Sequence, residues 1–224
     1  MPNDELIVLA CSRKTGGLCI AGIEPRTGRW IRPVSGVGNG ELYPQHCDVN
    51  GRPPQLLEIV QFDHTGPTGD PAQPENVRIA QSQWSLTGVV PAASAYHTLA
   101  STLVSGPTLL GDTEVSIDDT VAQQGIPASL ALIAPEDLEF RLAARGPYPA
   151  SPRASFHLDG CDYDLPITDR QVRPALQRAG VGTHDLVQLG FPAATRVLLT
   201  ISLGEPINPG QARWKLIAAI VQLP

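Results

Sequence analysis

Short apolar runs rich in β-branched residues alternate with Gly- and Pro-rich turns along the chain, a pattern typical of strands. In the first third the runs are "ELIVLAC" (5–11), "LCIAGIE" (18–24), "RWIRPV" (29–34) and "LLEIVQF" (56–62). The Gly pair of "SRKTGG" (12–17) supplies the positive backbone angles of a tight turn. We therefore predict that residues 1–35 form a β-meander whose first hairpin carries Ser12, Arg13 and Lys14 at its tip.

The second half repeats the pattern of strands and turns, with apolar runs at 129–135, 138–144, 195–206 and 213–224. In "ASFHLDGCDYDLPITD", Asp159-Gly160 is a strong type I′ hairpin signal. A two-residue turn there pairs Phe156 with Tyr163, Leu158 with Cys161, and His157 with Asp162. Helices are expected in the Ala-rich stretch 92–104 and in "DRQVRPALQRA" (169–179), the latter capped by Thr168 or Asp169.

Each half offers about five strands and one short helix, which is the strand count of an OB-fold, a partly open Greek-key barrel. We predict a mainly β protein with two OB-like barrels, or closely related small β-barrels, and a few short helices. The first lobe is expected at 1–90, a helical and loop connector at 91–128 and the second lobe at 129–224. A β-sandwich or an SH3-like barrel gives the same periodicity.

Charge is distributed unevenly along the chain. The net charge is −6, yet residues 1–32 hold five basic and three acidic residues, a local balance of +2. The first half of an anion site is therefore expected there, and the acidic remainder disfavours a long duplex-binding face. The four cysteines lack C-x-x-C spacing, which predicts free thiols and no zinc site. No metal or cofactor is predicted.

Membrane attachment and secretion are not expected. No apolar run approaches the ~18 residues of a membrane span, and the start carries acids where a secretory signal needs positive charge. We therefore expect a cytoplasmic protein.

The first lobe carries the clearest candidate binding residues. Arg13 can grip a phosphate bidentately and Lys14 adds a compact point charge, with a solvated hairpin tip as the alternative. Trp30 and Arg32 share a strand face, as base stacking beside a phosphate contact requires, although Trp30 is equally compatible with a core position. Asn76 in "QPEN" can read a base edge or form an Asx turn.

Polar residues at predicted strand ends of the second lobe are further candidates. Ser202, Glu205 and Lys215 can complete the site of the first lobe, with Glu205 accepting hydrogen bonds from a base or ribose. A surface ion pair between Glu205 and Lys215 is the alternative. Asp169 is most simply a helix cap. The five histidines lie in no recognisable Ser or Cys nucleophile signature.

Several motifs taken in order are similar to those of one family: "SRKTGGLCIAG", "WIRPVS", "GEL" (40–42), "QPEN" (73–76), "ASFHLDGCDYDLPITD", "SLGEP" and "WKLIAAIV". Together they resemble the bacterial dual OB-containing domain family. The resemblance implies two OB-like barrels and a presumed role in binding nucleic acid or nucleotide-derived ligands in bacterial conflict systems. It does not imply catalysis. Where the family pattern often has a His before "QPEN", this chain has Ala72.

These observations predict a protein that binds a nucleotide or a short single-stranded nucleic acid through Arg13, Lys14, Trp30 and Arg32, helped by the second lobe. One alternative is an enzyme acting on a nucleotide or nucleic-acid substrate in the inter-lobe cleft, with Asp169, Glu205 or Lys215 as acid or base. Another is an adaptor that recognises a protein partner through exposed strand edges.

Overall fold

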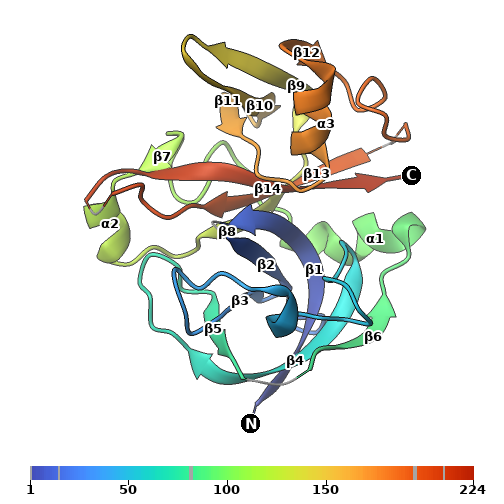
Figure 1. The fold of residues 1–224 in the computed structure, drawn as a ribbon, viewed down its shortest axis with the longest axis vertical. Helices are drawn as coiled ribbons and strands as arrows, with labels where there is room; N and C mark the ends of the chain where they lie inside the picture. The colour runs from blue at the N-terminus through green and yellow to red at the C-terminus, as the bar shows by residue number, and fades with distance from the viewer. Residues whose placement is uncertain (1, 15, 81–82, 194–195, 209) are drawn as a thin grey trace.

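The computed structural model describes residues 2–14, 16–80, 83–193, 196–208 and 210–224. It is mostly β-strand with a few short helices, arranged as two barrels packed against each other (Figure 1). In the view of Figure 1 the first barrel lies below, and β13 and β14 of the second barrel cross the middle of the molecule. The predicted fold class is confirmed.

Six strands build the first barrel: β1 (Asn3–Lys14), β2 (Gly17–Ile23), β3 (Trp30–Val34), β4 (Glu58–Pro67), β5 (Asn76–Ile79) and β6 (Ser85–Val89). The order β1-β2-β3-β5-β4 closes on itself because β4 also pairs with β1, and β3 runs parallel to β5. A 3-10 turn, η1 (Pro44–His46), lies between β3 and β4. Closure pairs β1 and β4 with each other, and among the described residues β6 remains an edge strand that pairs only with β4.

Strand β1 is a continuous apolar run because both of its faces are covered. Leu6 and Val8 point into the first barrel. Ile7 and Leu9 lie in a second core cluster that includes Leu132 of the second lobe. The pattern "ELIVLAC" thus encodes the contact between the lobes as well as the barrel interior.

The second barrel repeats the strand order of the first. Its strands are β8 (Leu130–Ile133), β9 (Glu136–Arg145), β10 (Tyr148–Leu158), β11 (Cys161–Pro166), β12 (Gly182–His184), β13 (Arg196–Leu203) and β14 (Arg213–Leu223). Strands β8 and β9 are consecutive, separated at Pro135, and pair with β13 and β10 respectively. A parallel bridge between Ile167 and Ile217 links β11 to β14. Helix α3 (Val172–Ala179) stands between β11 and β13.

The β10–β11 hairpin has the predicted register. Phe156 pairs with Tyr163, His157 with Asp162 and Leu158 with Cys161. Asp159 and Gly160 both have positive φ, 45° and 96°, as a type I′ turn requires. The aromatic rings of Phe156 and Tyr163 stack with centroids 5.5 Å apart, while Nδ1 of His157 lies 2.9 Å from Oδ1 of Asp162 on the other face.

The connector is attached to both lobes. It contains α1 (Ala92–Leu99), η2 (Ala100–Thr102), β7 (Ser116–Ile117) and α2 (Asp119–Gln123). The helix predicted over 92–104 ends as an α-helix at Leu99 and continues as a 3-10 turn. Leu99 packs in the core cluster between the lobes, and β7 pairs with β14. The lobe boundaries 1–90, 91–128 and 129–224 stay a prediction.

Part of the interface between the two lobes is formed by small side chains. Ala10 and Ala21 of the first lobe pack against Ala218 and Ala219 of the second. The Thr200 hydroxyl donates a 2.6 Å hydrogen bond to the carbonyl of Leu9. Together these contacts hold β1 against β13 and β14 and fix the geometry of any site between the lobes. No helix in the described part of the chain is long and apolar enough to cross a membrane.

Candidate functional site

A recess of about 450 Å³ lies where the β1–β2 hairpin of the first lobe meets β13, β14 and Thr168 of the second. We call it the inter-lobe recess. Its volume falls within the range of about 300–1,000 Å³ that ligand sites usually have. It brings together six of the candidate residues, namely Ser12, Arg13, Lys14, Arg32, Ser202 and Glu205.

The β1–β2 hairpin places its cations by reaching across to the second lobe. Strand β1 continues to Lys14, which pairs with Gly17, so Ser12 and Arg13 lie on the strand and not at the hairpin tip as predicted. The backbone N–H of Arg13 donates to the carbonyl of Thr168 at 3.3 Å, and Ser12 forms a β-bridge with Asp169. Arg13 itself remains exposed at the recess.

Arg32 is the buried cation of the recess, with 1 % of its surface exposed. Its Nη1 donates to Oδ1 of Asn76 at 3.2 Å. Its Nη2 donates to Oγ of Ser202 at 3.2 Å and to the carbonyl of Ser129 at 3.4 Å. Nε has no partner, and within the described ranges Arg32 forms no salt bridge. All three acceptors are neutral.

A buried guanidinium without a carboxylate is unusual. Arg cannot escape the cost of burial by losing its proton, because its pKa lies above about 12, and an unpaired buried charge costs several kcal/mol. Proteins normally place an acid beside such a group. An anion in the recess would supply the missing charge and an acceptor for Nε.

A chain of amides holds Arg32 in position. Nδ2 of Asn76 donates to Oε1 of Gln73 at 3.0 Å, and Nε2 of Gln73 donates to the carbonyl of Leu203 at 3.2 Å. Asn76 therefore acts on the recess through Arg32, and its own side chain lines a neighbouring cavity. The Asx turn does not describe these side-chain contacts, and the predicted base contact stays a prediction.

At the rim of the recess, the carboxylate of Glu205 contacts two cations, Lys14 and Arg213. Its Oε1 lies 3.2 Å from Nζ of Lys14, and its Oε2 accepts from Nη1 of Arg213 at 3.1 Å. Nε of Arg213 also donates to Oδ1 of Asp119 at 2.6 Å, and this bond holds the pKa of Asp119 below its ordinary value. The alternative pair between Glu205 and Lys215 is wrong, because Lys14 and Arg213 occupy the carboxylate.

Lys215 does not reach the recess. Its side chain is fully buried and its Nζ contacts Oδ1 of Asp112 at 2.5 Å. Leu216 and Ala218 of the same strand line the recess instead. Burial lowers the pKa of Lys215 even though Asp112 opposes the shift. The predicted role of Lys215 in the site is therefore wrong, because its side chain contacts Asp112 and does not line the recess.

Trp30 and Asp169 also lie outside the recess. Trp30 is partly buried and packs against the core clusters between the lobes, so it offers no stacking surface beside Arg32. The Asp169 carboxylate accepts from the backbone N–H groups of Gln171 and Val172, both at 2.8 Å, and of Ile220 at 3.2 Å. The bonds to Gln171 and Val172 agree with the interpretation of Asp169 as a helix cap. Burial raises the pKa of Asp169. Of the three residues suggested as acid or base for an enzyme, Asp169 and Lys215 therefore lie outside the recess, and only Glu205 lines it.

Several residues of the recess were absent from the predicted set. They are Cys19, Asn39, Gln73, Thr168, Leu203, Gly204, Pro206, Ile207, Leu216 and Ala218. Of these residues, Gln73 could have been predicted from the sequence, because it belongs to the "QPEN" motif. Ile207 is 79 % exposed, and a large apolar side chain at a polar rim is a surface on which a planar group can rest.

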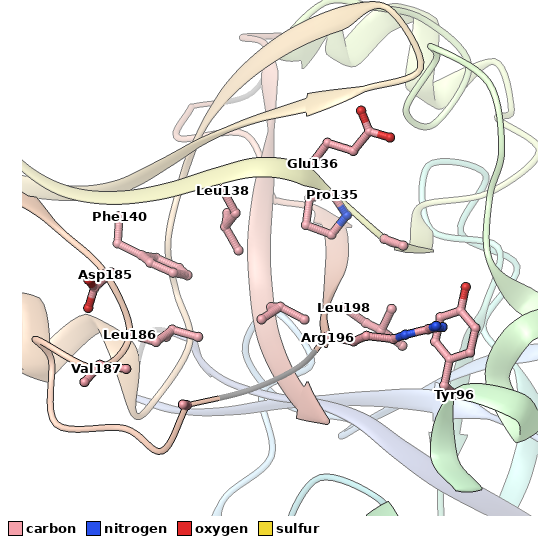
Figure 2. A pocket seen from close by; sticks show the side chains of 13 residues that line it. Tyr96, Pro135, Glu136, Leu138, Phe140, Asp185, Leu186, Val187, Arg196 and Leu198 are labelled. Carbon is pink, nitrogen blue, oxygen red and sulfur yellow. The ribbon is translucent and has the colours of Figure 1, made fainter. Parts of the chain in front are cut away.

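A second large cavity lies on the other side of the second barrel. It measures about 690 Å³ and opens between β9, β13 and the loop before β13. Figure 2 shows Leu138, Phe140 and Leu186 pointing into it, while Arg196 reaches toward Tyr96. The guanidinium carbon of Arg196 lies 4.0 Å from the centre of the Tyr96 ring. Its walls are mainly apolar and contain none of the predicted site residues, so the inter-lobe recess is the better candidate for an anionic ligand.

Two OB-like barrels that share a cation-lined recess define an OB-fold binding protein. The chain matches the family model described as dual OB-containing domain over residues 4–220, and it belongs to that family. The comparison with curated proteins gives no match.

Proposed function

We propose that the protein binds a nucleotide or a short single-stranded nucleic acid, with a phosphate held in the inter-lobe recess. The observation that carries this proposal is the buried guanidinium of Arg32, which has no acidic partner in the described part of the chain and a free Nε. Arg13 and Lys14 add two further cations at the same recess. A phosphate offers the charge and the several acceptors that this set of donors needs.

The shape of the recess favours a small ligand over duplex. The chain is acidic overall, and the cations lie inside a recess bounded by both lobes instead of along an open face. None of the described residues that line the recess is aromatic. A base would therefore rest on apolar side chains such as Ile207 and Leu216, and the phosphate contacts would dominate the affinity.

The setting of this function is also a proposal. All four cysteines are free thiols, which suits a reducing compartment, and we therefore propose a cytoplasmic location. A role in bacterial conflict systems follows from the family resemblance.

Isothermal titration calorimetry with a panel of nucleotides and single-stranded oligonucleotides tests the proposal. We expect at least one member to bind, and we expect binding to weaken as salt is raised. Arg32→Gln should weaken it by about tenfold or more, because a hydrogen bond to a charged group contributes about 1.5–3 kcal/mol. Arg196→Gln is the matched control and should leave binding unchanged.

A second variant keeps the test decisive if Arg32→Gln does not fold. Arg13→Ala combined with Lys14→Ala changes an exposed and a partly exposed residue, and circular dichroism can check that the strands persist. This double variant should abolish binding. Unchanged affinity in the folded double variant, or no binding by any member of the panel, would reject the recess as a nucleotide site.

A further inference from the structure

Three cavities adjoin one another along the first barrel, beginning at the inter-lobe recess. The recess shares Asn39 and Glu205 with a second cavity of about 300 Å³. The second shares Gly36 and Arg78 with a third, of about 660 Å³, which is also lined by Trp84. We call this series of cavities the groove. It continues the recess in one direction, over the surface of the first lobe.

Each end of the groove has a buried donor without an acceptor. In the described ranges three buried side-chain polar atoms lack a partner, and two of them are Nε of Arg32 and Nε1 of Trp84. The third belongs to His64, which lines none of the three cavities. Trp84 is 3 % exposed, and its ring stacks on Phe62 with centroids 4.9 Å apart. Buried donors are nearly always satisfied by protein, water or a ligand, so these two atoms are the candidate donors for a ligand that occupies the groove.

Arg78 supplies a cation between these two ends. It lines both the second and the third cavity, is exposed, and forms no salt bridge with any residue that the structure describes. Its Nη1 lies 3.0 Å from the position that a Cβ on Gly36 would take, so the guanidinium rests over the backbone of the loop. Nearby Asp48 and Asp70 direct carboxylate oxygens to backbone N–H groups of their own turns, at 3.1 and 2.9 Å.

The loop beneath the second cavity presents backbone where other loops present side chains. Gly38 and Gly40 have positive φ, 56° and 83°. A Cβ on Gly38 would lie 2.2 Å from Oε1 of Glu41, and Oε2 of the same carboxylate accepts from the N–H of Asn39 at 2.8 Å. The positive φ at both positions therefore favours glycine, which adopts it without strain.

We propose that the ligand is an extended chain of at least two linked nucleotides, and not a single nucleotide. One phosphate lies at Arg32, a following phosphate lies at Arg78, and an acceptor of the next unit binds Nε1 of Trp84. This inference rests on the proposed function and assigns two further subsites, at Arg78 and Trp84. A mononucleotide fills only the recess, so it leaves the second cation and the indole donor without partners.

Calorimetry with a mononucleotide, a dinucleotide and a tetranucleotide of the base that binds best in the panel tests the inference. Affinity should rise from the mononucleotide to the tetranucleotide. Arg78→Gln should weaken tetranucleotide binding about fivefold, the effect of one exposed ion pair, and leave mononucleotide binding unchanged. Trp84→Phe keeps the ring and removes the N–H, and it should weaken tetranucleotide binding by about the same factor. Arg196→Gln again serves as the control.

The outcomes separate this inference from the proposed function. If the mononucleotide and the tetranucleotide bind equally well, and binding depends on Arg32 but not on Arg78, the inference of an extended ligand is overturned. The proposal of a phosphate site in the inter-lobe recess is then retained. An equal loss for both ligands in Arg78→Gln would also overturn it. If no ligand of the series binds, the proposed function itself fails.

Discussion

Replacing Glu205 by Gln removes one negative charge from the rim of the inter-lobe recess and should strengthen anion binding. The carboxylate lies 3.2 Å from Nζ of Lys14 and its side chain is 32 % exposed. At an effective dielectric constant of about 20 the Coulomb energy of such a pair is about 5 kcal/mol, but measured values for solvated pairs are at most about 1 kcal/mol. A phosphate that binds Lys14 must displace the Glu205 carboxylate from the Lys14 ammonium. Removing the competitor should therefore tighten binding about fivefold.

The assay is a titration of wild-type and Glu205→Gln protein with the best ligand of the panel, at low and at high salt. The gain should shrink at high salt, because screening weakens both interactions. The fold should be little affected, since Arg213 keeps its contact with Asp119. A fall in affinity would refute the reasoning and would show that Glu205 accepts hydrogen bonds from the ligand.

Two predictions concern the buried groups. Lys215→Met combined with Asp112→Asn should be no less stable than wild type, because replacing a buried ion pair by uncharged residues is often neutral or stabilising by about 1–4 kcal/mol. Burial lowers the pKa of Lys215, so the unfolded chain binds the proton more readily, and wild-type stability should rise with pH toward the ordinary lysine value of about 10.4. The free energy of unfolding, measured with urea at about pH 7 and about pH 10, should rise between these pH values in wild type but not in the variant. The same rise in both proteins would contradict a lowered pKa of Lys215. Burial raises the pKa of Cys47 to about 12 and also raises that of Cys11, so a thiol reagent at about pH 8 should modify the folded protein at the two partly exposed thiols first. Four equal rates in folded protein would count against the buried positions.

The sequence carries enough information to predict the mainly β fold and the β10–β11 hairpin, but not the number of strands, which is higher than the five expected in each half. The β10–β11 register follows from Asp159-Gly160 alone, because a two-residue turn fixes every pair on both strands. The convergence of Arg13 and Lys14 with Ser202 and Glu205 was also expected. That expectation rested on the cations of the first hairpin and on polar residues at predicted strand ends of the second lobe, and it also named Lys215, which lies elsewhere.

The burial of individual strand residues was harder to predict. Alternation placed Trp30 and Arg32 on one face, but alternation cannot tell whether a face meets solvent or another lobe. In the structure the second lobe covers that face, so Arg32 is enclosed by Ser129 and Ser202. Lys215 has a similar explanation, since β7 and Asp112 of the connector cover its face of β14. Such contacts depend on lobe packing, which a local pattern does not encode.

The most direct test of the central claim is a crystal structure of the protein grown with the dinucleotide. The account predicts density for a phosphate in the inter-lobe recess, with one oxygen about 3 Å from Nε of Arg32, a normal hydrogen-bond distance. The second phosphate should face Arg78. A dinucleotide seated beside Arg196 in the other cavity, with Nε of Arg32 still lacking an acceptor, would contradict the account.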